Sequence, residues 1–229
     1  MWFAAIATAL ISARYFLIPA RWLTIPAAAS LLKGPVGESL QNLAPHLYHN
    51  HRFVLLFHIA CGIVALLLGL FQFVPSLRSA RPTLHRTIGM IYVSAVVLSG
   101  IAGFPLSFMM YAAHSPAIRP LFLPTLVGLA SLSIAWPLTT LMALTRAKQR
   151  RFADHRAWMI RSYALTFAAP TARLLAPLLF VFTGDVVLAI NVTFLSWPLN
   201  LLAAQLLIHQ SALRSAYAPI PVTPTLEGT

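Results

Sequence analysis

The chain has 229 residues, of which 59% are hydrophobic and 9% are charged. A water-soluble domain carries about a quarter charged residues, so this composition excludes an ordinary soluble fold. The formal net charge is +12, but the basic residues lie between apolar stretches and form no basic domain. This pattern argues against nucleic acid as a partner and favours contact with a lipid bilayer that carries anionic headgroups.

Six apolar stretches are long enough to cross a membrane as helices, because a spanning helix needs about 20 apolar residues. In chain order they are 2–23, 53–74, 84–112, 121–144, 158–182 and 186–208. The sequence therefore predicts an all-α fold, an integral membrane bundle of about six transmembrane helices with spans two to five as a four-helix core. We expect one transmembrane domain over residues 1–216, followed by a Pro-rich, disordered cytoplasmic tail over 217–229.

Lysine and arginine are distributed unevenly over the connecting segments. Nine lie in 75–86, in 145–156 and near the C-terminus, whereas four lie in the segments on the opposite side. The positive-inside rule places the nine in the cytoplasm. The sequence therefore predicts a multi-pass protein of the bacterial inner membrane with both termini in the cytoplasm and a long external loop over 24–52.

His58 lies near the outer end of the second span, and Gly62 and Gly69 follow on the same helical face. Glycines beside a histidine leave room for a flat group such as a porphyrin, whose iron His58 would bind. The alternative is a histidine that hydrogen-bonds across closely packed helices.

His85 and His155 each begin a span that rises from the cytoplasmic side. Two imidazoles at the same depth on different helices are what a haem b iron with two axial histidines requires. We therefore predict both as haem ligands. The alternative is that each, together with the arginine that follows it, binds lipid phosphate.

Arg161 and Arg173 lie inside the fifth span. Arg173 follows His155 by 18 residues, five helical turns, which puts it on the same face at about the level of His58. Asp185 is the nearest carboxylate that could pair with it. An inward-facing arginine without a carboxylate binds an anionic or carbonyl group, such as a haem propionate or a quinone oxygen. The alternative is hydrogen bonding to carbonyls freed by nearby prolines.

The expected external loop contains His46, His49 and His51. Imidazole nitrogens suit zinc, copper or iron, but this spacing matches no closed metal motif, and a solvated loop is the alternative. None of the six spans contains Asp or Glu, which argues against a carboxylate-driven transporter.

Several stretches together have the character of a known family. They are FHIACGIVALLLGLFQFVPSLR, PTLHRTIGMIYV and DHRAWMIRSYALTFAAPTARLLAP, with SARYFLIP in the first span. Over most of residues 10–180 the chain resembles the bacterial membrane protein family DUF2306, a domain of unknown function. The resemblance implies a multi-pass membrane protein with no established activity. The arrangement of histidines is also similar, more distantly, to transmembrane b-type cytochromes.

Two functions are compatible with these residues. The first is a haem-binding or quinone-interacting membrane redox protein with a redox partner, in which the cofactor carries the electrons and the helices position it. The second is a non-enzymatic protein, a small transporter or a partner subunit, whose histidines and arginines pack helices or bind lipid. No catalytic residue is assigned from the sequence.

The charge distribution makes a testable prediction about topology. Reporters fused after Arg214 or within 145–156 should report the cytoplasm, whereas a reporter at Glu38 should report the outside. A periplasmic signal from the C-terminal fusion would mean an odd number of crossings, and the first predicted span, 2–23, would then be the one that does not cross the membrane.

Overall fold

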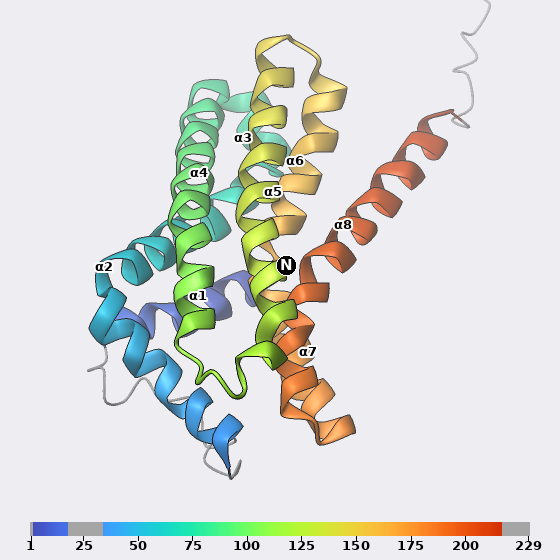
Figure 1. The fold of residues 1–229 in the computed structure, drawn as a ribbon. Helices are drawn as coiled ribbons and strands as arrows, with labels where there is room; N and C mark the ends of the chain where they lie inside the picture. Colours follow the sequence, from blue (N-terminus) through green and yellow to red (C-terminus); the bar gives the residue numbers. More distant parts are fainter. Residues whose placement is uncertain (1, 18–33, 217–229) are drawn as a thin grey trace, which may run out of the picture.

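A computed structural model describes residues 2–17 and 34–216, and these ranges are all-helical (Figure 1). The helices are α1 (Trp2–Leu17), α2 (Pro35–Phe71), α3 (Pro75–Ala80), α4 (Pro82–Ala112), the 3₁₀ helix η3 (Arg119–Phe122), α5 (Leu123–Lys148), α6 (Phe152–Thr166), α7 (Ala168–Thr183) and α8 (Val186–Ala216). The all-α prediction is confirmed. The predicted tail over 217–229 and the predicted end of the first span, 18–23, lie outside the described residues.

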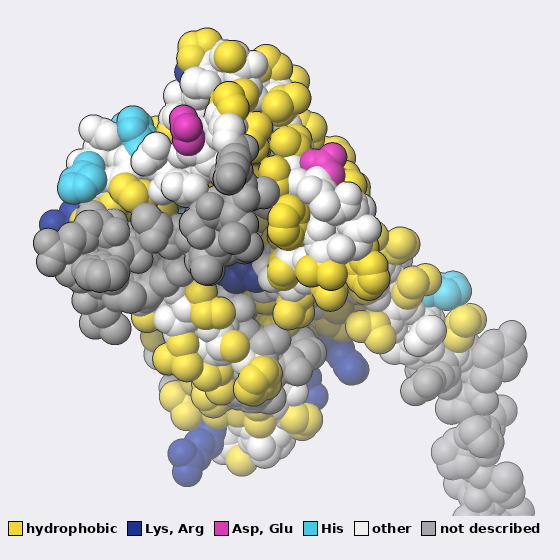
Figure 2. Space-filling model, turned by 90° about the horizontal axis from the view of Figure 1, so that it is seen from below, with side chains coloured by type: hydrophobic (Ala, Val, Ile, Leu, Met, Phe, Trp, Pro, Cys, Tyr) yellow, Lys and Arg dark blue, Asp and Glu magenta, His cyan; other side chains and the backbone are white. Residues whose placement is uncertain are grey.

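The helices have the side-chain distribution of a membrane protein. α2, α4, α8 and the unit formed by η3 and α5 are each long and apolar enough to cross a membrane, and α6 with α7 would make a fifth crossing. Large apolar side chains such as Phe182 face outward, whereas Ser99, Thr140 and Ser162 are fully buried. Hydrophobic atoms cover much of the described surface in Figure 2. Apolar side chains on the outside and hydroxyl side chains on the inside form the pattern expected of helices packed in lipid.

The predicted fifth span, 158–182, is broken at Phe167, where α6 and α7 meet at 43°. Pro170 explains the break, because proline has no N–H to donate to the carbonyl of Thr166 and its ring clashes with that carbonyl. As a result α6 packs against α5, while α7 turns away and packs against α8.

The prediction of a loop over 24–52 is wrong for residues 35–50, which are helical. The backbone leaves helical geometry at His51 (φ −134°, ψ 30°), so α2 consists of two helical segments joined by a kink. The first segment buries Leu40, Ala44 and Leu47, a spacing of four and three residues that gives it one apolar face. This face folds the segment onto the end of the bundle.

The connections group at two ends of the bundle (Figure 1). α3, the α5–α6 connection and the C-terminal end of α8 lie at the upper end, whereas the start of α2 and the α4–α5 and α7–α8 connections lie at the lower end. The two segments richest in lysine and arginine, 75–86 and 145–156, therefore share one end. α1 runs across the bundle in this view and turns the small side chains of Ala5, Thr8, Ala9 and Ser12 inward.

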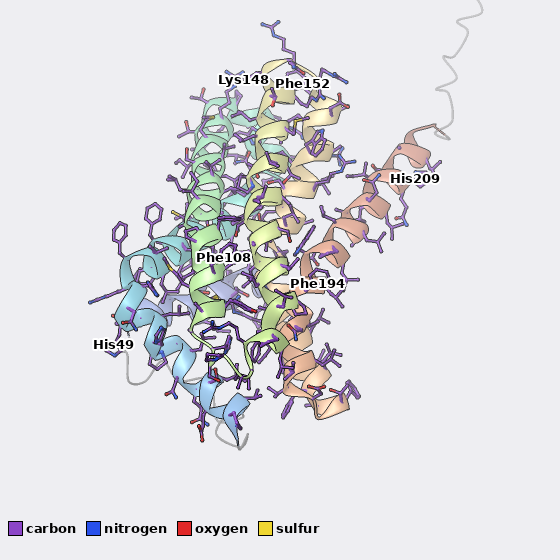
Figure 3. The ribbon with its side chains drawn as sticks, in the orientation of Figure 1. His49, Phe108, Lys148, Phe152, Phe194 and His209 are labelled. Carbon is purple, nitrogen blue, oxygen red and sulfur yellow. The ribbon has the colours of Figure 1, made fainter. Side chains whose placement is uncertain are left out.

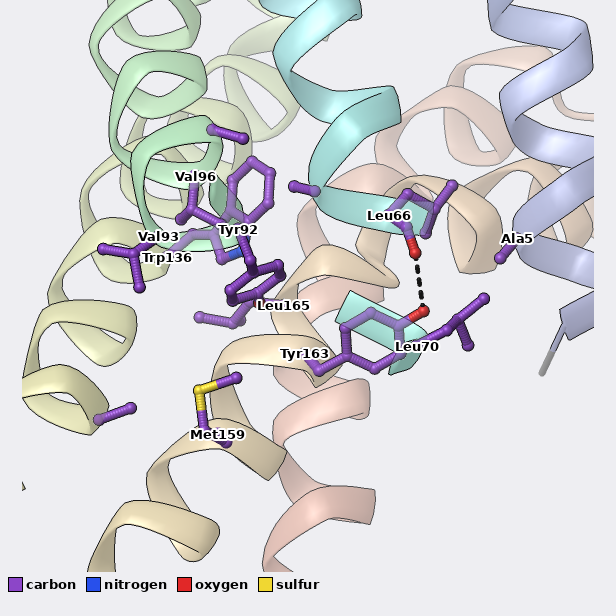
Figure 4. Close-up of a cluster of buried hydrophobic side chains, with 13 residues drawn as sticks. Ala5, Leu66, Leu70, Tyr92, Val93, Val96, Trp136, Met159, Tyr163 and Leu165 are labelled. Atoms are coloured by element: carbon purple, nitrogen blue, oxygen red, sulfur yellow. Dashed lines mark hydrogen bonds between the residues drawn. The ribbon is translucent and has the colours of Figure 1, made fainter. Parts of the chain in front are cut away.

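The main buried cluster joins α1, α2, α4, α5 and α6 around two tyrosines (Figure 4). Tyr163 packs beside Leu70, and its hydroxyl donates a hydrogen bond to the carbonyl of Leu66 at 3.0 Å. Glycines allow the close approach of these helices. A Cβ on Gly69 would collide with the rings of Tyr163 and Tyr92.

Gly100 allows a close contact between α4 and α5. A Cβ at this position would collide with the Pro137 ring and lie 2.8 Å from the backbone oxygen of Ser133. Gly62 makes no comparable contact, since a Cβ there would meet only the Ser99 hydroxyl at 3.9 Å.

These two glycines give a matched stability test. Gly100→Ala should destabilise the fold by about 1–3 kcal/mol, because a backbone atom cannot move aside without shifting a helix. Gly62→Ala should be neutral or stabilising by up to about 1 kcal/mol, since alanine favours the helix and meets ordinary contact distances. The unfolding midpoint of the purified protein in detergent measures both. Equal midpoints for the two variants would contradict the close α4–α5 contact.

Candidate functional site

A cavity of about 490 Å³ lies at the centre of the bundle, within the size range of small-molecule sites. Its lining is mostly apolar, with two ionisable side chains, His58 from α2 and Arg173 from α7. The remaining polar lining is mainly hydroxyl groups, from Thr8, Ser12, Ser99, Ser107, Thr125, Ser133, Thr166, Thr193 and Ser196. Most of the helices contribute to it, so its shape depends on the whole bundle.

His58 is held in one orientation by α4. Its Nδ1 lies 2.9 Å from the carbonyl oxygen of Ser99, and the Ser99 hydroxyl donates to the carbonyl of His58 at 3.3 Å. A carbonyl oxygen only accepts hydrogen bonds, so Nδ1 carries the proton of the neutral ring. Nε2 is then an acceptor, and it belongs to a residue that lines the cavity. Gly103 makes the space, because a Cβ there would lie 2.9 Å from the ring.

Of the two glycines expected to leave room beside His58, only one does so. Gly62 lines the cavity, whereas Gly69 packs under Tyr163. His58 both makes an interhelical hydrogen bond and lines a cavity. A role in helix packing and a role in binding a ligand are therefore compatible.

Arg173 lines the same cavity as His58, and its side chain is exposed. Its Nη2 donates to the Ser12 hydroxyl at 3.4 Å. The carboxylate of Asp185 caps α8 by accepting from the backbone N–H groups of Val187 and Leu188, so it is engaged there rather than with Arg173. The straight helix assumed between His155 and Arg173 is broken at Phe167, yet the structure still brings Arg173 and His58 to one site.

Arg161 lies outside this cavity. It donates to the side-chain oxygen of Gln205 at 2.8 Å, and its guanidinium lies 4.9 Å from the Trp158 ring centroid. It therefore links α6 to α8 and does not share a site with His58 in the structure.

His85 and His155 lie near the other end of the bundle and do not line the central cavity. Their rings are close enough to interact electrostatically. His155 donates from Nδ1 to the carbonyl of Ala143 at 2.8 Å, whereas Nδ1 of His85 is buried without a hydrogen-bond partner among the described residues.

This difference bears on haem ligation by the pair. A histidine that binds a metal through Nε2 has its Nδ1 proton held by an acceptor. His155 has such an acceptor in Ala143, and His85 has none, so His155 fits an axial ligand and His85 does not. The acceptor on Ala143 could not be read from the sequence, because it lies on α5 rather than beside His155.

The histidines expected in the external loop lie on α2. Their rings are loosely arranged, with the centroids of His46 and His51 6.3 Å apart, and His49 extends outward in Figure 3. Within residues 2–17 and 34–216, no cluster of three or more His, Cys, Asp or Glu side chains is close enough to hold a metal ion.

One wall of the cavity is backed by a network of hydrogen-bonded hydroxyl groups, which the sequence did not indicate. The hydroxyl of Tyr92 shares hydrogen bonds with Ser162 at 2.7 Å and Thr166 at 3.0 Å, and Thr166 also accepts from the Trp136 indole N–H at 2.9 Å. Thr140 and Ser162 are joined at 2.6 Å. Thr166 and Trp136 line the cavity, so the network fixes one of its walls.

One comparison with known proteins gives a match. The family described as "Predicted membrane protein (DUF2306)" matches residues 55–208, a range that contains His58, His85, His155 and both arginines discussed above. No curated protein and no solved structure matches the chain. The matched range exceeds half of the 229 residues, and the chain therefore belongs to the DUF2306 family of predicted membrane proteins.

Proposed function

We propose that the central cavity binds a quinone-class lipid, with the head group between His58 and Arg173. The observation that carries this proposal is the pairing of two complementary groups in one apolar cavity. His58 presents an acceptor nitrogen whose orientation is fixed by Ser99, and Arg173 presents a cationic donor. A small number of precisely placed polar groups in an otherwise apolar cavity is typical of small-molecule sites.

The chemistry of the ligand follows from these two groups. A quinone head group is a flat ring with an oxygen on each side, and in its reduced form each oxygen carries a proton. Nε2 of His58 accepts one of these O–H groups, and the Arg173 guanidinium donates to the other oxygen. The ring and the isoprenoid tail suit the apolar lining, which includes Leu129 and Leu132. In a redox role the ligand carries the electrons and the chain positions it.

Haem b is the second candidate, favoured by the hydrogen bond that fixes His58. A ligating histidine holds its Nδ1 proton on an acceptor in the way His58 does with Ser99, and Arg173 would hold a propionate. Met110 also lines the cavity and has a side chain that can bind iron. The His85 and His155 pair is a weaker haem proposal, because Nδ1 of His85 lacks an acceptor.

The proposal includes a topology. The chain crosses the bacterial inner membrane about six times with both termini in the cytoplasm, and spans two to five provide most of the lining of the site. The grouping of the basic segments at one end supports this orientation. His58 then lies in the outer half of the membrane, because it follows the kink at His51 by seven residues.

Binding of a short-tailed quinol by the purified protein tests the proposal. His58→Ala and Arg173→Gln should each weaken binding by about tenfold or more, the loss expected when a polar ligand group is left without its partner. The controls are His209→Ala and Arg156→Gln, which replace exposed residues outside the cavity. Equal affinities in all four variants, or no binding to the unaltered protein, would sink the quinone site.

An absorption spectrum of the same preparations separates the two candidates. A Soret band that disappears in His58→Ala and persists in His155→Ala would place haem in the central cavity. The opposite pattern would favour the cytoplasmic pair. A colourless protein that binds quinol leaves the first proposal standing, and one that does neither favours the non-enzymatic alternative.

A further inference from the structure

The outer end of the central cavity adjoins a second, smaller chamber. Its volume is about 30 Å³, enough for one water molecule. The two cavities share five lining residues, Ser107, Met110, Thr125, Leu129 and Ile190. Only the small chamber is lined by His114 and by Leu40 and Leu43 of α2. A route from the central cavity toward the lower end of the bundle therefore passes between His114 and α2.

His114 closes this route. It is 5% exposed, and its ring stacks on Phe122 with centroids 3.9 Å apart and planes inclined by 10°. Its Nδ1 is joined to the hydroxyl of Ser39, on α2, at 2.8 Å. The ring thus contacts both the fixed part of the bundle and the helical segment that covers it.

The covering segment is the part of α2 before the kink, residues 35–50. Leu40 packs against Ile118 and Phe122, and Leu47 packs against Leu55 and Leu106. These contacts are apolar, and the backbone at His51 is outside helical geometry. A segment that packs on the bundle through one apolar face, and that is joined to the rest of α2 through a non-helical residue, can move as a unit.

We propose that residues 35–50 form a lid over the outer end of the central cavity, that His114 is the latch, and that protonation of His114 opens the lid. A protonated ring in this position would be a buried cation beside Arg119, which already donates from Nε and Nη2 to the carbonyl of His114. An uncompensated buried charge of this kind is costly. Lifting the segment exposes the ring to water and removes the cost.

Among the residues that the structure describes, no carboxylate lines the chamber beside His114 to offset that charge. Among the residues that line the small chamber, Tyr111 of α4 is the other titratable group, and α5 and α8 contribute uncharged residues. Glu38, beside Ser39, is exposed, and Asp185 is occupied in capping α8. His46 and His49 lie on the lid and His51 lies at the kink, and these three histidines serve as controls below.

The direction of the pH dependence follows from the latch. Burial, and then the Arg119 guanidinium, hold the pKa of His114 below its ordinary value of 6.5. Because the pKa in the closed form is lower than in an exposed histidine, the closed form is fully stable at neutral pH. Its stability falls as the pH drops below the ordinary value toward the lowered one. Acid on the outer side therefore opens the lid, and neutral pH closes it.

Cysteine accessibility tests this without any ligand, so its outcome is independent of the quinone proposal. In a Cys61→Ala background, Ser133→Cys places a thiol on the cavity wall, and Ser115→Cys places one on the exposed α4–α5 connection. A small charged methanethiosulfonate reagent is applied to each purified protein. The ratio of the two labelling rates cancels the effect of pH on thiol reactivity.

At pH 7.5, adding Ser39→Ala should raise the ratio roughly 3- to 10-fold, the effect of losing one hydrogen bond. In the unaltered latch, the ratio should rise as the pH falls from 7.5 to 5. The rise should vanish in His114→Asn, which cannot be protonated, and persist when His46, His49 and His51 are all replaced by glutamine. A folded Ser39→Ala protein with an unchanged ratio would overturn the lid. A pH rise that survives in His114→Asn, or that is lost in the triple glutamine variant, would overturn the latch.

Discussion

The hydroxyl of Tyr92 is the contact on which the centre of this bundle depends. In a membrane, helices gain little from burying apolar side chains against one another, because lipid is equally apolar, so packing and hydrogen bonds hold them together. Tyr92 joins α4 to α6 through Ser162 and Thr166, and those residues join α6 to Thr140 and Trp136 of α5. Every hydroxyl in the network has a partner, and none is exposed to more than 7%.

This network also determines where the cavity can form. It pins α6 as far as Thr166, one residue before the break at Phe167. Beyond the break, α7 turns toward α8 and leaves space beside α5. The residues that α7 and the break present to that space are small, among them Ala168, Ala169, Ala172 and Ala176. The hydrogen-bonded network on one side and the alanines of α7 on the other together account for a large cavity in a chain of this length. They also bring Arg173 to the edge of the cavity.

The parts of the fold that follow from hydrophobic length could be predicted, since apolar stretches of about 20 residues mark helices in a membrane. The pairing of His58 with Arg173 was also within reach, because it needs only helical rise and the direction of each span. The features that the sequence did not predict are those that depend on contacts with other helices. Residues 35–50 looked like a loop because their apolar face is narrow and interrupted by polar side chains. The inward orientation of Tyr92, and the acceptor that Ala143 offers to His155, have no local sequence signal.

The kink at His51 has a mechanical consequence. A helix rises about 1.5 Å per residue, so Ser39 lies roughly 18 Å from the kink, whereas Leu47 lies roughly 6 Å from it. A rotation about His51 displaces Ser39 about three times as far as Leu47. The covering segment is therefore a lever whose hydrogen bond through Ser39 lies far from the pivot and whose apolar contact through Leu47 lies near it. The contacts near Ser39, which include its hydrogen bond to His114 and the packing of Leu40, therefore resist rotation with the longer arm.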